Sequence, residues 1–383
     1  MSFQDVNTRR GRLAAIGLLT ALAAVPLAPL CADPLPPSGP PVATGLDNPK
    51  GLRFGLDGSL YIAEAGHGGS GACVISAEQQ EVCFGATGAI TQVKNGVQRR
   101  IVTGLPSLAG ADGFAATGPH DVSALGNGIL FVPIGLGNAP AATAPGSVLA
   151  GSGLGTLIRA NGRSGHWTTV ADLAAYEGAN DPDGSGPDTN PFGALALPGR
   201  TFVVDSGANA ILKVTPWGTS TFAVFADELV PAPDFLGLPP GAQIPMQAVP
   251  TAIARGPRGN LYVGRLTGFP FPVGGAQVVE LTPAGEQVHS IDGFTNVVDL
   301  TFGPDGSLYV VEISQSSLLS GAMDGAVWKV DPAAASKDEA ELIAEVEAPG
   351  GAAFGPDGNL YVTAGTVVPA SAGGGVVLRF DLH

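Results

Sequence analysis

The chain has 383 residues, of which 57 are glycine and 33 are proline, and only 13% of its residues are charged. Glycine and proline interrupt helices, so this composition excludes a fold of long helices, while a hydrophobic share of 45% excludes a disordered chain. The formal net charge of −15 argues against nucleic acid and against an anionic membrane surface as partners. These numbers favour an all-β fold with many turns.

The N-terminal segment 1–32 has the pattern of an export signal. A basic stretch at residues 9–12 precedes an apolar run at 13–30, and this order is typical of a signal peptide. Its paired arginines look like a twin-arginine signal, with cleavage expected after Ala32. Two alternatives stay open, a lipid-bearing N-terminus at Cys31 and an uncleaved anchor. We expect an exported protein, periplasmic or extracellular, with no membrane span once the signal is removed.

The mature chain then keeps two cysteines, Cys73 and Cys83, which lie in one glycine-rich loop. An exported protein meets an oxidising compartment, where two neighbouring thiols form a disulfide. We therefore predict a disulfide that closes this loop. The alternative is a pair of free thiols.

One pattern recurs six times along the rest of the chain. A short apolar strand is followed by a tight glycine-containing turn and then by a second apolar strand with an aromatic residue near its start. Asp-Gly or Asn-Gly between two apolar runs is typical of a β-hairpin. The copies lie at 48–64, 118–134, 190–205, 249–265, 296–312 and 348–364.

A third strand is expected after each copy, and a fourth after most. Four antiparallel strands form one blade of a β-propeller, so six copies predict a six-bladed ring. The last copy has no fourth strand, whereas residues 42–46 resemble the end of the first blade's fourth strand at 102–105. We expect 42–46 to complete the last blade and to close 33–383 into a single domain. The third strands are predicted at 88–96, 155–162, 209–218, 276–285, 325–332 and 375–383.

The long loops are all of two kinds, between second and third strands and between successive blades. In an up-and-down blade both kinds lie on one side of the ring, which we call the long-loop face. Function usually resides on such loops, so we expect a small-molecule or protein partner on this face, over the central channel. The loops are 65–87, 135–154, 266–275, 313–324, 365–374, 106–117, 171–189 and 230–248.

Polar residues recur where the innermost strands begin and where the second strands end, next to the channel mouth. Converging carboxylates are what Ca²⁺ or another divalent cation requires, and Glu64, Asp205 and Asn209 are candidate ligands. Alternatively, these acids accept backbone N–H groups or pair with basic residues. The channel-mouth candidates are Glu64, His120, Asp121, Asp205, Arg265, Asp299 and Glu312.

Other chemistry has little support, because the sequence contains no GxSxG, HExxH or phosphate-binding loop motif. His120 beside Asp121 is a candidate general base, with a hydrogen-bonded structural histidine as the alternative. Phe269 and Phe271 stand between prolines in the loop 266–275. They form either a wall for an aromatic ligand or a lid that folds over the channel.

The crossover from the second to the third blade, GANDPDGSGPDTNPFG at 178–193, is rich in acidic and amide side chains. No glutamate closes it at the twelfth position, so its spacing departs from that of an EF-hand. We expect Asp181, Asp183 and Asp188 to cover the shared channel site rather than to form a metal site of their own.

Several of these segments together resemble the ScyD/ScyE family of exported, NHL-like propeller proteins. The resemblance covers most of the mature chain and implies a six-bladed propeller and export. Some members belong to gene clusters for the cyanobacterial sunscreen scytonemin, which implies an accessory role in secondary metabolism. The resemblance brings no established catalytic residue. It rests on the Cys73–Cys83 loop and on the segments 118–128, 180–193, 266–274 and 294–313.

Three function classes follow. The leading hypothesis is an exported propeller that binds a small molecule or a protein at its long-loop face. The second is a metal-dependent lactonase or hydrolase, because related gluconolactonase-like propellers use a divalent cation in the channel to activate water or to polarise a lactone. Glu64, Asp205 and Asn209 would then hold the ion. The third is a structural or interaction module of the cell envelope.

Overall fold

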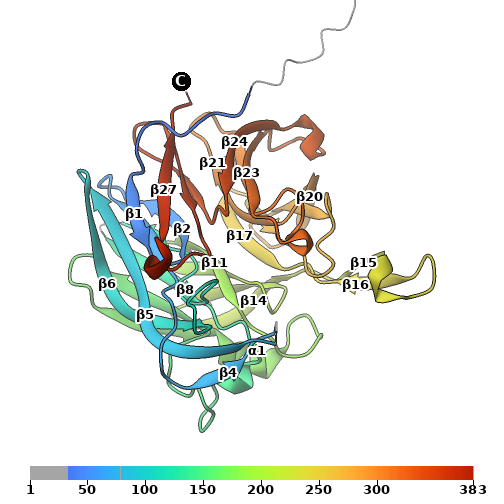
Figure 1. Cartoon of the computed structure of the whole chain (residues 1–383), viewed down its shortest axis with the longest axis horizontal. Helices are drawn as coiled ribbons and strands as arrows, with labels where there is room; N and C mark the ends of the chain where they lie inside the picture. The colour runs from blue at the N-terminus through green and yellow to red at the C-terminus, as the bar shows by residue number, and fades with distance from the viewer. Residues whose placement is uncertain (1–32, 78, 127, 383) are drawn as a thin grey trace, which may run out of the picture. The chain divides into compact units, whose positions relative to one another are not determined.

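The computed structural model describes residues 33–382 except 78 and 127, so the predicted signal segment lies outside the described residues. Residues from Asp33 onward form one compact unit. Its six four-stranded antiparallel arrangements confirm the predicted all-β, six-bladed propeller (Figure 1). In blades one to five the strands follow one another from the innermost to the outermost in chain order, because each is joined to the next by a hairpin turn or loop, whereas the outermost strand of blade six comes from the N-terminal end of the described residues.

Six sets of strands, each ordered from the innermost to the outermost, make up the ring. Blade one holds β2 (Pro49–Phe54), β3 (Leu60–Glu64), β5 (Glu81–Lys94) and β6 (Val97–Ala109), and blade two holds β7 (Ser123–Leu125), β8 (Ile129–Ile134), β9 (Thr156–Asn161) and β10 (Trp167–Asp172). Blade three holds β11 (Pro191–Leu197), β12 (Arg200–Asp205), β13 (Ala210–Thr215) and β14 (Gly218–Val224), and blade four holds β17 (Pro250–Arg255), β18 (Leu261–Arg265), β19 (Ala276–Leu281) and β20 (Gln287–Phe294). Blade five holds β21 (Val297–Phe302), β22 (Leu308–Glu312), β23 (Asp324–Val330) and β24 (Glu341–Glu347), and blade six holds β25 (Ala352–Phe354), β26 (Leu360–Ala364), β27 (Gly375–Phe380) and β1 (Ala43–Leu46).

The ring closes as predicted, with the N-terminal strand as the outer strand of the last blade. β1 pairs antiparallel with β27, where Ala43 lies opposite Val377 and Leu46 opposite Gly375 (Figure 1). Leu46 is fully buried between the last and first blades. Closure therefore removes the free edge that β27 would otherwise expose.

Aromatic contacts join one blade to the next. The tyrosine after the turn in a second strand packs edge to face against the phenylalanine that ends the innermost strand of the following blade, a favoured geometry for two rings. The contact from blade six to blade one continues this pattern across the ring closure. The pairs are Tyr262–Phe302, Tyr309–Phe354 and Tyr361–Phe54, with ring centroids 5.0, 4.8 and 4.9 Å apart.

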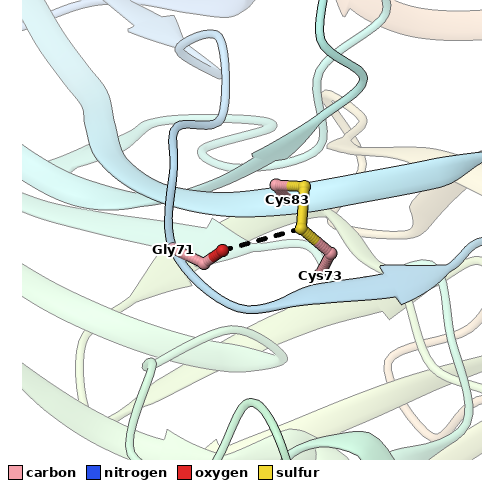
Figure 2. Close-up of a disulfide and its surroundings, with 3 residues drawn as sticks. All are labelled: Gly71, Cys73 and Cys83. Carbon is pink, nitrogen blue, oxygen red and sulfur yellow. Dashed lines mark hydrogen bonds between the residues drawn. A yellow bond between two sulfur atoms is a disulfide. The ribbon is translucent and has the colours of Figure 1, made fainter.

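Blade one is longer than predicted on its outer side. Its third strand begins at Glu81 instead of residue 88, and its fourth ends at Ala109 instead of residue 105. The extension pairs with β4 (Cys73–Ile75), and the predicted disulfide between Cys73 and Cys83 is confirmed there (Figure 2). The disulfide joins the two strands of this hairpin at a place where Cys73 and Cys83 lie directly opposite each other.

Two regular elements stand where loops were predicted. Helix α1 (Leu173–Asn180) begins at Asp172, whose carboxylate caps the Ala175 N–H at 2.8 Å. Strands β15 (Glu228–Pro231) and β16 (Gln243–Met246) form a hairpin that projects from the ring between blades three and four (Figure 1). Short 3-10 turns lie at Pro140–Ala142, Asp234–Leu236, Leu318–Ser320, Lys337–Glu339 and Ala370–Ala372. Within the described residues, no helix is long and apolar enough to cross a membrane.

Candidate functional site

Three of the predicted acids share one structural role at the ends of second strands. Glu64, Asp205 and Glu312 are all fully buried. Each accepts a hydrogen bond from the backbone N–H of a residue just before the innermost strand of its own blade, and the donors are Asp47, Asn190 and Thr295 at 2.7, 2.6 and 2.6 Å. These carboxylates therefore fix the chain where it turns into each blade.

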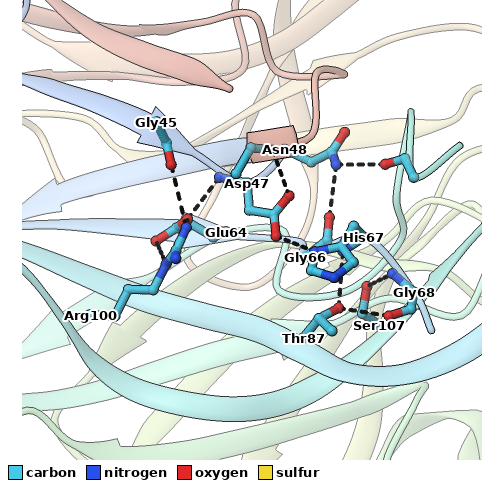
Figure 3. A network of polar contacts seen from close by, with 12 residues as sticks. Gly45, Asp47, Asn48, Glu64, Gly66, His67, Gly68, Thr87, Arg100 and Ser107 are labelled. Carbon is cyan, nitrogen blue, oxygen red and sulfur yellow. Dashed lines mark hydrogen bonds and ion pairs between the residues drawn. The ribbon is translucent and has the colours of Figure 1, made fainter. Parts of the chain in front are cut away.

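Glu64 is bound by a cation from the outermost strand of blade one. Arg100 places its Nη2 at 2.6 Å and its Nε at 3.1 Å from the carboxylate (Figure 3). Thr91 donates its hydroxyl to the same group. Next to this pair, His67 contacts the carboxylate of Asp47 (Figure 3). A metal ion at Glu64 would have to displace the guanidinium of Arg100.

Glu312 has the same arrangement with a lysine. Both of its oxygens accept hydrogen bonds from Lys337 Nζ, at 2.7 and 2.8 Å, and Trp328 Nε1 donates to one of them at 2.8 Å. Burial raises the pKa of Glu312, and the charge of Lys337 acts against that rise. The charge of Glu312 is thus balanced inside blade five.

Blade four reverses the sign of the charge at this position. Arg265 is buried, and its guanidinium forms an ion pair with Glu228 on β15 at 2.7 Å and a hydrogen bond to Gln277 at 2.8 Å. The bond to Glu228 ties the projecting hairpin to the ring. The role of Arg265 is therefore to bind the β15–β16 hairpin, and its charge is already paired with Glu228.

The other two predicted acids, Asp121 and Asp299, come together near the axis from blades two and five. Asp121 accepts from the Ala194 N–H at 2.9 Å and Asp299 from the Ala352 N–H at 2.8 Å, so each carboxylate links its innermost strand to that of the next blade. Burial raises the pKa of both carboxyls, and the charge of Asp121 adds to the rise of Asp299, whose pKa is about 7.

Glycines leave the space that these carboxylates occupy. A Cβ on Gly51 would overlap the carboxylate of Asp121, and a Cβ on Gly351 would lie 3.1 Å from Asp299 Oδ2 and 2.9 Å from the Gly51 Cα. Glycine at these two places, the third residue of β2 and the residue just before β25, is therefore required by the close approach of the strands.

His120 sits beside this pair in a structural setting. Its Nδ1 donates to the Pro191 carbonyl at 3.1 Å, and its ring packs against Phe192 with centroids 4.5 Å apart. Burial and the charge of Lys50 lower the pKa of His120 to about 3, and burial lowers the pKa of Lys50 to about 8. A neutral, hydrogen-bonded imidazole with so low a pKa is a weak base.

We expect the native protein to lose stability as the pH rises from 5 to 8, and we expect the substitution Asp299→Asn to reduce that loss. The folded-state pKa of about 7 lies above the unfolded value of about 3.9, so the folded state holds the proton more tightly. Its contribution to stability is therefore present at low pH and is lost as the pH rises through 7, by on the order of 1–2 kcal/mol for this half-buried group. Urea unfolding at several pH values measures the difference.

The side-chain amide introduced by this substitution would still accept the Ala352 N–H through its oxygen, so the variant changes charge and little else. Asp305→Asn is the control, because the hydrogen bond from Lys329 holds the pKa of Asp305 below its usual value and leaves it ionised throughout this range. Equal pH slopes in the native protein and Asp299→Asn would contradict the expectation.

Asn209 connects blade three to the crossover that precedes it. Its Nδ2 donates to Asp183 at 2.8 Å, and its Oδ1 accepts from the Val249 N–H at 2.9 Å. Asp205 lies in the same blade, whereas Glu64 is bound within blade one. Among the described residues, no three His, Cys, Asp or Glu side chains are placed to hold one metal ion. A cation held by Glu64, Asp205 and Asn209 stays a prediction.

The loop with Phe269 and Phe271 lies against the projecting hairpin. Phe269 is exposed and faces Phe235 of the hairpin loop in a T-shaped contact, with ring centroids 6.2 Å apart, while Phe271 is half-buried. The two segments together present an apolar surface to solvent. Its exposed side chains are Leu229, Phe235, Leu236, Leu238, Phe269 and Val273.

A pocket of about 530 Å³ opens on the long-loop face between α1 and the loop after β8. Small apolar residues form most of its walls, and the polar ones are Thr143 and Asp172. The sequence analysis missed this pocket, because alanines and prolines carry no recognisable motif. Its lining includes Pro140, Ala144, Pro145, Ala175, Ala179 and Pro187.

A more polar pocket of about 400 Å³ lies on the opposite side, beside the short turns of blades four and five.

No protein-family model and no curated protein matches this chain. Solved structures match it at low identity. A calcium-binding regucalcin from Agrobacterium tumefaciens is 13% identical, with 91% of this chain and 95% of that chain covered and a TM-score of 0.50. A streptogramin B lyase is 12% identical over 91% and 96% of the two chains, with a TM-score of 0.46, and a putative gluconolactonase is 12% identical over 91% and 94%, also with 0.46. The likeness is one of fold.

Proposed function

We propose that this protein is an exported binding propeller that takes an apolar small molecule in the pocket between α1 and the loop after β8. The pocket carries the proposal. Its volume of about 530 Å³ falls in the range of small-molecule sites, and its walls are mainly alanine and proline with few polar groups. Such a lining favours a ligand with a large apolar surface and few hydrogen-bonding groups.

The charged residues of the ring support binding over catalysis. Each predicted channel acid is held by backbone N–H groups or by a cation of its own blade, and His120 is a weak base. A metal-dependent lactonase is the competing function, and it needs an ion near Glu64, Asp205 and Asn209. These side chains already bind Arg100, the backbone near Asn190, and Asp183.

Export and membership of the ScyD/ScyE family belong to the same proposal. The Cys73–Cys83 disulfide is consistent with an oxidising compartment outside the cytoplasm. A protein or cell-envelope partner at the apolar surface of the hairpin is a different role, which this proposal does not require.

A neutral aromatic probe, N-phenyl-1-naphthylamine, tests the pocket, because its fluorescence rises when it leaves water. We expect saturable binding to the native protein and an affinity roughly tenfold or more lower for Ala175→Trp, since an indole at this exposed position fills the pocket. Ala86→Trp is the matched control, because Ala86 is exposed on β5 and outside the pocket. Absence of saturable binding, or equal affinity of Ala175→Trp and the native protein, would overturn the proposal.

A further inference from the structure

Acidic side chains gather over blade three around the C-terminus of α1. One comes from the helix, three from the crossover that follows it, and one from the end of β12. These side chains lie close enough in space to interact, because the charges of four of them raise the pKa of the fifth, Glu177. The group consists of Glu177, Asp181, Asp183, Asp188 and Asp205.

Glu177 differs from Asp181, Asp183 and Asp205 because its carboxylate has no hydrogen-bond partner in the described part of the chain. Its exposed fraction is 0%, and neither carboxylate oxygen accepts a hydrogen bond from the described residues. Asp181 and Asp183, by contrast, accept from the backbone N–H groups of Gly186 and Ser185, and Asp205 accepts from Asn190. A buried carboxylate without a donor or a counter-charge is costly and calls for an explanation.

No basic side chain of the described residues bonds to this carboxylate. Burial is the main cause of its raised pKa, which is about 8, and the charged residues that add most to the rise, Asp181, Asp183, Asp188 and Asp205, are all acidic. This is the reverse of Glu64 and Glu312, which are buried to the same degree and are each paired with a basic side chain. A pKa of about 8 leaves this carboxyl mostly protonated at pH 7 when no cation is bound, and a cation from solution would supply the counter-charge that its ionised form lacks.

We propose that a divalent cation of the calcium class binds between the C-terminal turn of α1 and the loop 181–188, with the carboxylate of Glu177 as a ligand. Calcium takes six to eight oxygen ligands from carboxylates, carbonyls, amides and hydroxyls, and it tolerates irregular geometry. The crossover offers oxygens of this kind at close spacing, from Asp181, Asp183, Ser185 and Asp188.

The local backbone suits a cation. α1 ends at Asp181 in the left-handed region, and the negative end of the helix dipole lies there. Gly184 and Gly186 take positive φ values of 71° and 101°, and their N–H groups bond back to the carbonyl and the carboxylate of Asp181. In an EF-hand the closing glutamate follows the loop, whereas here Glu177 precedes it on the helix. The sequence spacing therefore gave no sign of this site.

The ligand set also indicates the class of ion. No histidine or cysteine lies in the crossover, and its acids are not already placed around one point, so the loop would have to draw them together when an ion binds. A closed zinc site is thus disfavoured, while calcium binds through mixed oxygen ligands in flexible loops. The inference is independent of the proposed pocket ligand, although the pocket is lined in part by Gly178 and Ala179 of the last turn of α1 and by Pro187 of the loop 181–188.

Calcium chloride added to chelator-treated protein tests the site directly by calorimetry and by the melting temperature. Terbium is a second probe, because Tyr176 stands next to Glu177 and can sensitise terbium luminescence. We expect one ion per chain, a rise in melting temperature with calcium, and terbium emission that calcium displaces. Magnesium should bind more weakly, because it demands a regular octahedral site.

The variant Glu177→Gln separates a ligand from a structural residue. As a ligand, it should lose calcium affinity by roughly tenfold or more and lose the calcium-induced rise in melting temperature. Without calcium, it should melt no lower than the native protein, because a neutral amide replaces a carboxyl that is unpaired and mostly protonated at pH 7. Asp183→Asn should also weaken calcium binding.

The control is Glu347→Gln in a second acidic group, with Asp324 and Glu345, on blade five. It should bind calcium as the native protein does. The proposal is overturned if neither calcium nor terbium binds, if Glu177→Gln keeps native affinity, or if Glu347→Gln is the variant that loses it. None of these outcomes depends on binding of the fluorescent aromatic probe.

Discussion

Replacing Lys337 with methionine is expected to lower the free energy of unfolding by about 3 kcal/mol. The substitution leaves Glu312 fully buried with its two neutral donors, Thr295 N–H and Trp328 Nε1, but without a positive charge. Removing one partner of a buried pair typically costs about 3–5 kcal/mol, because the remaining charge has no compensation. Lys337 is only 18% exposed, so water replaces little of the lost interaction. Methionine keeps some of the packing that Lys337 makes over the Trp328 ring, 4.1 Å from its centroid.

The same blade provides the control. Lys329 also pairs with an acid, Asp305, but both side chains are partly exposed at a turn. Lys329→Met should therefore change stability by less than about 1 kcal/mol. Urea unfolding of both variants measures the difference. Equal losses of unfolding free energy would contradict the expectation that the buried Glu312 depends more on its cation than the exposed Asp305 does.

The loss of unfolding free energy caused by Lys337→Met should also depend on pH. Burial holds the folded-state pKa of Glu312 above its unfolded value, and loss of Lys337 raises it further. The ionised carboxylate therefore opposes folding only at pH values above the unfolded pKa, and the deficit should shrink as the pH falls from 8 toward 5.

Leu46→Ala is expected to destabilise the protein by about 3 kcal/mol, because it weakens the closure of the ring. Leu46 is fully buried and packs with Leu52, Leu60 and Val377, which belong to blades one and six. Truncation of a buried leucine to alanine typically costs about 2–5 kcal/mol through lost contacts and a residual cavity. The same side chain therefore holds together two ends of the chain that are far apart in sequence.

Thr44→Ala is the matched control, because Thr44 is exposed on the same four-residue strand and bonds Gln98 only through its backbone. Its effect should stay within about 0.5 kcal/mol. Hydrogen exchange of β27 adds a local measurement, since Leu46→Ala should speed the exchange of amides that pair with β1. Similar stability of the two variants would mean that closure by β1 contributes little to the ring.

The last residue of the second strand has a related structural role in several blades. Glutamate or aspartate at this place fixes the chain before the innermost strand in blades one, three and five, whereas arginine in blade four instead binds the hairpin through Glu228. We interpret the channel-mouth acids mainly as part of the architecture. Ligand recognition is then left to the loops, where the pocket and Glu177 lie.

The sequence by itself determined the repeat, the number of blades, the closing strand and the disulfide. These features depend on local information, because alternating apolar residues and glycine turns specify strands and hairpins over a few residues. The closure of the ring could be predicted by counting the strands of each repeat, because the last repeat lacked a fourth strand and residues 42–46 matched one. The two cysteines were close enough in sequence for their pairing to be inferred.

Only the tertiary structure decided the partners of the buried charges. Arg100 reaches Glu64 and Lys337 reaches Glu312 from positions 36 and 25 residues away, on or just before the outermost strand of the blade. Such distances are set by how the strands stack, and no periodic pattern encodes them. Glu177 was likewise not a candidate in the sequence, because nothing local distinguishes a buried glutamate without a partner from one that faces water. Its burial and its lack of a counter-charge arise only when α1, the crossover and β12 pack together, since the cost of a charge depends on its surroundings.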